Sequence, residues 1–219
     1  MGKSLVLYYL EASPPARSVD LVINALGLSA EHKVVNLFER AHFSPDYVKI
    51  NPLRTVPAIN DDGFILYESR AIMTYLVSNY GKDDSLYPRD LSKRAIVDQR
   101  LHYSNDVFFV LELALKPLLF ELKKPNEQAL GRIREAQENI EKLLTGQKFI
   151  AGDSLTVADY SLVTIVDALG VFCPPEGKFP LTEEWFRRCQ VVMKNFSSVN
   201  KNGAEQLVNV LSSLLAMIP

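Results

Sequence analysis

The sequence predicts an α/β domain followed by an all-α domain. Short apolar runs alternate with helical patterns as far as Tyr80, in the βαβ-ββα order of a small mixed sheet. After Asp90 no strand pattern occurs, and the apolar residues recur at helical spacing. Residues 81–89 lie between these halves and are polar, with Gly and Pro among them. We therefore expect domains at residues 1–80 and 90–219, joined by a linker at 81–89.

Four apolar segments of the first half predict its strands. Ser4–Leu10 and His32–Phe38 are short apolar runs on either side of a helical pattern, as in a strand–helix–strand unit. Pro57–Asn60 and Phe64–Tyr67 flank Asp-Asp-Gly, which predicts a turn between two strands.

Helical patterns separate and follow these strands. Pro14 and Pro15 suit the first positions of a helix, and Gly27 suits its end. Pro45–Ile50 predicts a helical turn, and Ser69–Tyr80 predicts a further helix.

The second half predicts five helices. Thr156 to Asp159 has the pattern of an N-terminal capping box, with Asp in place of the usual Glu, so a helix begins there and continues to about Leu169. Pro117 lacks an N–H and is expected to bend the first of the five helices. The other four are expected at Asp90–Leu122, Asn126–Leu144, Glu183–Asn195 and Ala204–Met217.

The composition excludes several classes of protein. Lys and Arg number 24 against 26 Asp and Glu, and the net charge of −2 argues against nucleic-acid binding. Two cysteines rule out a disulfide-dense scaffold and a four-cysteine zinc site, and the three histidines form no metal-ligand pattern. The apolar segments at Ser4–Leu10 and Leu207–Pro219 are too short to span a membrane, and the first lacks a signal-peptide cleavage pattern. We expect a cytoplasmic protein without a metal.

A serine stands where the first strand gives way to the first helix. Ser13 precedes Pro14 and Pro15, and Ser-Pro is a common helix start, so Ser13 could be only an N-cap. Alternatively, its hydroxyl and the free N–H groups of the helix N-terminus could hold a thiolate in its ionised form. A free thiol titrates near about pH 8.5, and such surroundings lower that value.

Two further segments could bind the ends of a peptide-like ligand. A cis Val56–Pro57 bond would expose the backbone of Val56 to such a ligand, although a trans proline at the start of an edge strand is the commoner arrangement. Ser69, at a helix start, could donate to a carboxylate, and Glu68 could accept from an ammonium group. Simple capping beside a solvated charge pair is the alternative for these two residues.

Four segments together resemble the signatures of the cytosolic glutathione transferases in order and spacing: YYLEASPPARSV, INPLRTVPAI, GFILYESRAIMTYL and FIAGDSLTVADYSL. The resemblance covers essentially the whole chain and is greatest to the insect delta/epsilon group, in particular the epsilon class. The VNLF run and the SPP start are similar to the Noppera-bo-type epsilon proteins, which are linked to ecdysteroid production. The resemblance implies a thioredoxin-like N-terminal domain, a C-terminal helical bundle, glutathione as co-substrate and a homodimer.

The resemblance also implies roles for individual residues. Ser13 would stabilise the glutathione thiolate. The family commonly has His where this chain has Arg54, whose fixed charge can still attract the glycine carboxylate. The implied glutathione contacts are His42, Arg54, Val56, the cis proline Pro57, Glu68, Ser69 and Arg70.

A hydrophobic-substrate pocket is implied between the two domains. Most of its expected residues are apolar, as suits an apolar ligand, although some could belong to the core instead. Glu112 could pair with Lys116, or it could face the pocket and accept a hydrogen bond from a hydroxylated steroid. The expected pocket residues are Pro14, Leu37, Phe38, Phe108, Phe109, Glu112, Leu113, Phe172, Leu207 and Leu211.

The expected reaction is attack of the glutathione thiolate on an electrophilic carbon in this pocket. The alternatives are a steroid- or hydrophobic-ligand-binding protein that keeps glutathione as part of its site, and a non-catalytic partner-binding module. Thiol–disulfide exchange is disfavoured, because serine stands where that chemistry needs a thiol. In the implied homodimer, His102, Tyr103 and Asp106 are expected to face the partner.

Overall fold

A four-stranded mixed sheet forms the first half of the computed structural model, which describes residues 4–218. The strand order is β2-β1-β3-β4, with β1 and β2 parallel and the other neighbours antiparallel. This topology confirms the expected βαβ-ββα arrangement of a thioredoxin-like domain. The strands are β1 (Leu5–Tyr9), β2 (Ala30–Val34), β3 (Ala58–Asp61) and β4 (Phe64–Tyr67).

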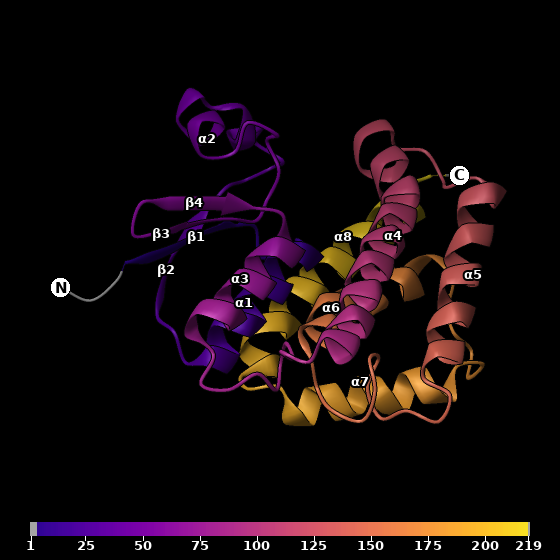
Figure 1. The fold of residues 1–219 in the computed structure, drawn as a ribbon. Coiled ribbons are helices and arrows are strands. Elements are labelled where there is room, and N and C mark those ends of the chain that lie inside the picture. Colours follow the sequence, from indigo (N-terminus) through magenta and orange to yellow (C-terminus); the bar gives the residue numbers. More distant parts are fainter. Residues whose placement is uncertain (1–3, 219) are drawn as a thin grey trace.

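Three helices accompany the sheet: α1 (Pro14–Leu26), α2 (Pro45–Ile50) and α3 (Ser69–Tyr80). Figure 1 shows α1 and α3 together on one side of the sheet and α2 beyond the other side. Leu7 of β1 and Ile59 of β3 are fully buried in the core that these helices cover. Gly27 ends α1 in the left-handed conformation, with φ 69°, as its position predicts.

Apart from loops and an isolated β-bridge between Phe149 and Gly152, the second half of the described chain is helical. Helix α6 is the central one, and it packs against α1, α4 and α8. Helix α7 runs along the lower edge of the molecule and α5 along its outer side (Figure 1). None of the helices in residues 4–218 is both long and apolar enough to cross a membrane. The helices are α4 (Leu91–Glu121), α5 (Glu127–Leu143), α6 (Val157–Phe172), α7 (Pro180–Val192) and α8 (Asn202–Met217).

The predicted capping box at the start of α6 is confirmed. The Asp159 carboxylate accepts a hydrogen bond from the Thr156 N–H over 2.9 Å. The same carboxylate accepts from the Ile150 N–H and from Trp185 Nε1, each over 2.8 Å. A local helix cap therefore also anchors α7 and the segment before α6.

The second strand differs from its prediction. The strand expected at His32–Phe38 is β2, Ala30–Val34, and most of its residues are exposed. Strand β1 has five residues, and its register pairs Leu5 with Ala30 and Tyr9 with Val34, so the ladder ends there. Val35 leaves the ladder and is buried in a separate apolar cluster.

Two helix boundaries in the second half also differ from their predictions. Helix α7 begins at Pro180, which suits a first helical position, and ends at Val192 instead of Asn195. A π-helical segment, Ser197–Lys201, then leads into α8 and was not predicted. Helix α4, by contrast, spans almost the whole of the predicted segment Asp90–Leu122, with Pro117 inside it.

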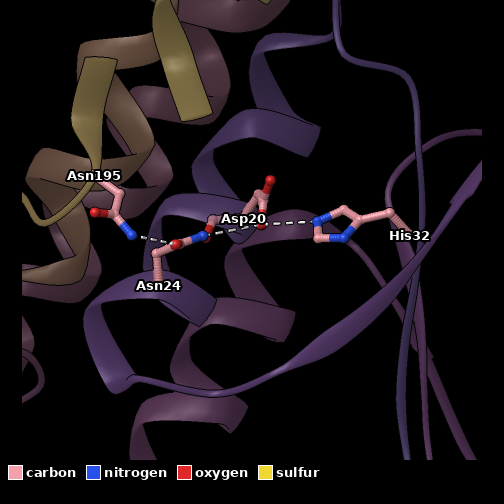
Figure 2. A network of polar contacts seen from close by, with 4 residues as sticks. All are labelled: Asp20, Asn24, His32 and Asn195. Atoms are coloured by element: carbon pink, nitrogen blue, oxygen red, sulfur yellow. Dashed lines mark hydrogen bonds and ion pairs between the residues drawn. The ribbon is translucent and has the colours of Figure 1, made fainter. Parts of the chain in front are cut away.

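A network of polar side chains connects the edge strand β2 to the helical half. Figure 2 shows His32 of β2 directed at Asp20 of α1, with Nε2 and Oδ1 3.0 Å apart. Asn24 donates to Asp20 Oδ1 over 3.3 Å and accepts from Asn195 Nδ2 over 2.9 Å. Asn195 follows α7, so this chain of contacts helps to seat α1 between the two halves.

Candidate active site

Ser13 is the N-cap residue of α1, but its hydroxyl caps no backbone N–H of the helix. Its own N–H donates to the Leu10 carbonyl over 2.9 Å, and the Ala16 N–H donates to the Ser13 carbonyl. Pro14 and Pro15 have no N–H to offer. The expectation of free N–H groups at this helix end is therefore wrong, and the hydroxyl is the donor that this turn leaves uncommitted.

A cleft of about 200 Å³ lies between the segment Thr55–Pro57, the start of α3 and one face of α4. The Val56–Pro57 peptide bond is cis, as the resemblance implied. Ser69 is buried at the first position of α3, where N–H groups are free to bind an anion. The residues that line the cleft are Pro15, Thr55, Val56, Pro57, Glu68, Ser69, Arg70, Asn105, Phe108, Phe109 and Glu112.

Glu68 precedes α3 in an unusual backbone conformation, with φ 73°. A positive φ at a residue other than glycine costs about 1–3 kcal/mol, and such strain is concentrated at functional sites. The Glu68 side chain is exposed and makes no cap bond to α3. Its carboxylate is therefore available to a ligand in the cleft.

Arg70 connects α3 to the long helix α4. Its Nη2 donates to the Ser104 carbonyl over 2.9 Å, and its Nη1 donates to Ser69 Oγ over 3.2 Å. Burial lowers the pKa of Arg70 to about 10, against the opposing effect of Glu68. Arg70 therefore orients Ser69, and much of its hydrogen-bonding capacity is already in use.

Arg54 and His42 lie in a second cluster beside the cleft. The Arg54 guanidinium lies 5.0 Å from the ring centroid of Phe43, and that of Arg40 lies 4.9 Å from the same ring. Nδ1 of His42 is buried without a hydrogen-bond partner in the described chain. Burial, with the positive charges of Arg40 and Arg54, lowers the pKa of His42. The cluster is positively charged and suits a carboxylate.

The expected pocket residues are only partly brought together. Phe108, Phe109 and Glu112 line the cleft, whereas Leu207 and Leu211 are buried in the core. The remaining members lie outside the cleft lining: Pro14 is buried, Leu37 packs on a small apolar cluster, Phe38 and Leu113 are exposed, and Phe172 lines another cavity with Cys173.

Glu112 combines the two arrangements that were expected as alternatives. It lines the cleft, and its carboxylate accepts a hydrogen bond from Lys116 Nζ over 2.9 Å. The Glu112 side chain is 28% exposed and that of Lys116 is 60% exposed. An ion pair this exposed is weak, at about 0.3–0.5 kcal/mol, so a ligand hydroxyl can compete for the carboxylate.

Arg17 has a role that the sequence patterns did not indicate. It is only 2% exposed, and its Nη1 donates to the carbonyls of Glu11 and Ala12, the two residues before Ser13. Nε donates to Asn200 Oδ1 over 2.8 Å. Burial lowers its pKa to about 10. The only sequence signal was an arginine on the apolar face of a helix, at the spacing of its buried residues.

The residues expected at a partner interface do not share one environment. His102 and Asp106 are exposed, but the Tyr103 hydroxyl donates to the Ala136 carbonyl on α5 over 3.1 Å. Tyr103 therefore points into its own helical domain, and the expectation that it faces a partner is wrong. Residues 4–218 contain no group of three His, Cys, Asp or Glu side chains that could hold a metal ion.

Family models and relatives match almost the whole chain. The model of the glutathione S-transferase N-terminal domain matches residues 7–84, and that of the C-terminal domain matches residues 72–190. Glutathione S-transferase 1 of Manduca sexta is 42% identical over 190 residues, which cover 84% of this chain and 87% of that protein.

Solved structures agree with these matches. An epsilon-class glutathione S-transferase from the housefly, Musca domestica, has a TM-score of 0.92 and 43% identity, and the match covers 96% of this chain and 98% of that one. A glutathione transferase homologue from Drosophila mojavensis, with bound glutathione, has a TM-score of 0.91 and 38% identity. That match covers 97% of this chain and 98% of the other.

Proposed function

The chain belongs to the glutathione S-transferase family, and we propose that it conjugates glutathione to hydrophobic electrophiles with Ser13 as the residue that stabilises the thiolate. Its relatives are insect delta- and epsilon-class transferases, so it is an enzyme with glutathione as co-substrate. The uncommitted hydroxyl of Ser13 is the observation that carries the assignment of this residue.

The hydroxyl supports this role because it is a donor at the turn that caps no N–H group of α1. The Ser13 N–H is already bonded, and the next two residues are prolines. A hydrogen bond to a charged acceptor contributes about 1.5–3 kcal/mol, which lowers a thiol pKa by about one to two units. The positive end of the α1 dipole acts in the same direction.

The cleft supports binding of the rest of glutathione. Ser69 at the start of α3 would hold the γ-glutamyl carboxylate, and the exposed Glu68 would hold its ammonium group. The peptide unit of Val56, before the cis proline, lies in the cleft wall beside them. The Arg54 and His42 cluster would attract the glycine carboxylate.

Catalysis then depends on proximity and on the ionised thiol. The chain holds both reactants, and Phe108 and Phe109 provide an apolar wall for the electrophile. No covalent intermediate with the protein is required.

Replacing Ser13 by alanine tests this assignment. Turnover of 1-chloro-2,4-dinitrobenzene should fall about 10- to 100-fold, since the loss is a hydrogen bond to a charged group. The Kd for glutathione should change by less than about threefold, because the γ-glutamyl and glycine contacts remain. The matched control is Ser78→Ala, on the exposed face of α3. Unchanged turnover in Ser13→Ala would remove Ser13 from the mechanism.

We also propose, as the finer assignment, that the pocket accepts a hydroxylated steroid, as in an ecdysteroid-producing or steroid-binding transferase. The supporting feature is Glu112, a carboxylate in an otherwise apolar part of the cleft whose ion pair is weak. An acceptor in this position favours a ligand with a hydroxyl over one without it.

Paired variants of Glu112 and Lys116 test the steroid assignment. Glu112→Ala should weaken ecdysone binding about tenfold and leave glutathione binding unchanged, whereas Lys116→Ala should preserve ecdysone binding. If Glu112→Ala weakens the binding of ecdysone and of glutathione equally, or weakens neither, the steroid assignment is wrong. Tight ecdysone binding with no measurable turnover of an electrophile by the wild-type protein would favour steroid binding over conjugation as the role of this site.

We further propose that the protein is cytoplasmic and forms a homodimer. Each subunit would consist of two domains, residues 1–80 and 90–219. A hollow of about 410 Å³ between α3 and α4, lined by Ala71, Thr74 and His102 among others, supports a partner there. Both cysteines are buried and free, which fits a reducing compartment. Sedimentation should give twice the chain mass of 24.6 kDa, and a 24.6 kDa particle would refute the dimer.

A further inference from the structure

A separate cavity, of about 410 Å³, lies in the helical half, between α5, α6 and α7. It shares no lining residue with the cleft at Ser69. Its volume is within the range of sites that bind small molecules. The proposed transferase reaction makes no use of it.

The walls of this cavity are mainly apolar. Helix α6 contributes one side, α7 the opposite side, and the loop between them closes one end. Such a surface binds an apolar body by removing it from water. The apolar lining residues are Ile140, Val166, Leu169, Pro175, Phe179 and Phe186.

Asp167 places a carboxylate in this apolar lining. No hydrogen bond to that carboxylate exists within the described residues, and burial raises its pKa. The positive charge of Arg17 opposes this effect, but Arg17 forms no ion pair with Asp167 within 4.0 Å. Arg17 instead directs its donors to Asn200, Thr164 and the two residues before Ser13. A sheltered acceptor without a donor is unfavourable, and a ligand that supplies one relieves that cost.

The charges at the rim cancel. Glu183 and Arg187 line the cavity from α7, and both are exposed. Their formal charges are opposite, and Arg187 donates from Nε to the main-chain carbonyl of Glu183 over 3.3 Å. The net formal charge of the lining residues is therefore that of the Asp167 carboxylate.

We propose that this cavity is a second ligand site, for a small apolar molecule that carries one protonated amine. The apolar walls hold the body of the molecule, and the ammonium group donates to the Asp167 carboxylate. The site is independent of glutathione and does not rest on the proposed transferase function.

Calorimetric titration with two isosteric probes tests the site. The probes are 1-naphthylmethylamine, which is charged, and 1-naphthalenemethanol, which is not. Both are titrated into protein saturated with S-hexylglutathione, so that the cleft at Ser69 is filled. We expect the amine to bind at least about tenfold more tightly than the alcohol, because the ammonium group adds an ion pair to the hydrogen bond with the Asp167 carboxylate. Equal affinities, or binding of the amine only when S-hexylglutathione is absent, would overturn the proposal.

Three variants assign the binding to Asp167 and to this cavity. Asp167→Asn should remove the preference for the amine, and Glu183→Gln, at the rim, should change amine affinity by less than about twofold. Val166→Phe keeps Asp167 and fills the cavity, so it should abolish binding of both probes. This variant decides the matter if Asp167→Asn does not fold. Amine binding of wild-type strength in Val166→Phe would place the site elsewhere.

Discussion

Arg17 of α1 donates from Nη2 to the main-chain carbonyl of Thr164 on α6 over 3.0 Å, across 147 positions of sequence. The same guanidinium holds the carbonyls of Glu11 and Ala12, so the helical half supports the loop that carries Ser13. Gly203 of α8 adds to this support, because a Cβ at that position would lie 2.1 Å from the Glu11 carbonyl oxygen.

Arg17→Lys should impair catalysis without touching the substrates. Lysine cannot reproduce the planar fork of four hydrogen bonds, so we expect a loss of about 2–4 kcal/mol in the free energy of unfolding. The released Ser13 loop should lower kcat about tenfold and raise the apparent thiolate pKa in the pH–rate profile. A merely structural role would leave that pKa unchanged.

The control for this variant is Arg100→Lys. Arg100 also donates to a main-chain carbonyl, that of Ile150, over 2.9 Å, but within the helical half. Its replacement should leave kcat within about twofold of wild type. A folded Arg17→Lys protein with wild-type kcat and pH profile would disprove the positioning role.

Ser13→Ala should cost little stability although Ser13 is an N-cap residue. Losing a side-chain cap ordinarily costs about 1 kcal/mol, but the Ser13 hydroxyl makes no cap bond. Asn126→Ala is the matched control, because Asn126 Oδ1 accepts from the Ala129 N–H over 2.8 Å. Denaturant unfolding should show the larger loss in Asn126→Ala, and the reverse order would mean that Ser13 is engaged in capping.

Asp159→Asn should be strongly destabilising. The groups around the buried Asp159 carboxylate are N–H donors, among them Trp185 Nε1 and the main-chain N–H groups of Thr156 and Ile150. The side-chain NH₂ group of an asparagine would face one or more of these donors in place of an acceptor. We expect a loss of about 3–5 kcal/mol, measured by urea unfolding. Asp153→Asn, on the exposed segment before the same helix, should stay within about 0.5 kcal/mol of wild type.

His42 should make the free protein less stable in mild acid. Burial and the neighbouring Arg40 and Arg54 lower its pKa in the folded state, so the unfolded chain takes up the proton first as the pH falls below about 6.5. Stability is therefore lost as the pH falls through that range. His42→Gln should reduce the drop in Tm between about pH 7 and about pH 5. An unaltered drop in His42→Gln would assign the acid sensitivity to other groups.

Much of the fold was predictable from the sequence because its signals are local. Pro14 and Gly27 mark the two ends of α1, and the Thr156–Asp159 box marks the start of α6, since each acts within one helical turn. The turn before Phe64 is equally local, because Gly63 adopts φ 96°, which favours glycine. The element whose observed range differs most from its predicted range is β2. It is an edge strand, and its limits depend on the length of its partner β1.

The sequence by itself determined the two-domain plan, the family and the position of Ser13 at a strand–helix turn. Only the tertiary structure decided which apolar residues form a wall and which form the core: Phe108 lines the cleft, whereas Leu211 is fully buried. The tertiary structure also brought Arg17 to Thr164, and it left the Asp167 carboxylate without a hydrogen-bond donor among residues 4–218. The physical reason is that caps and turns are satisfied within a few residues, whereas burial and long-range hydrogen bonds depend on partners that the folded chain supplies from far along its length.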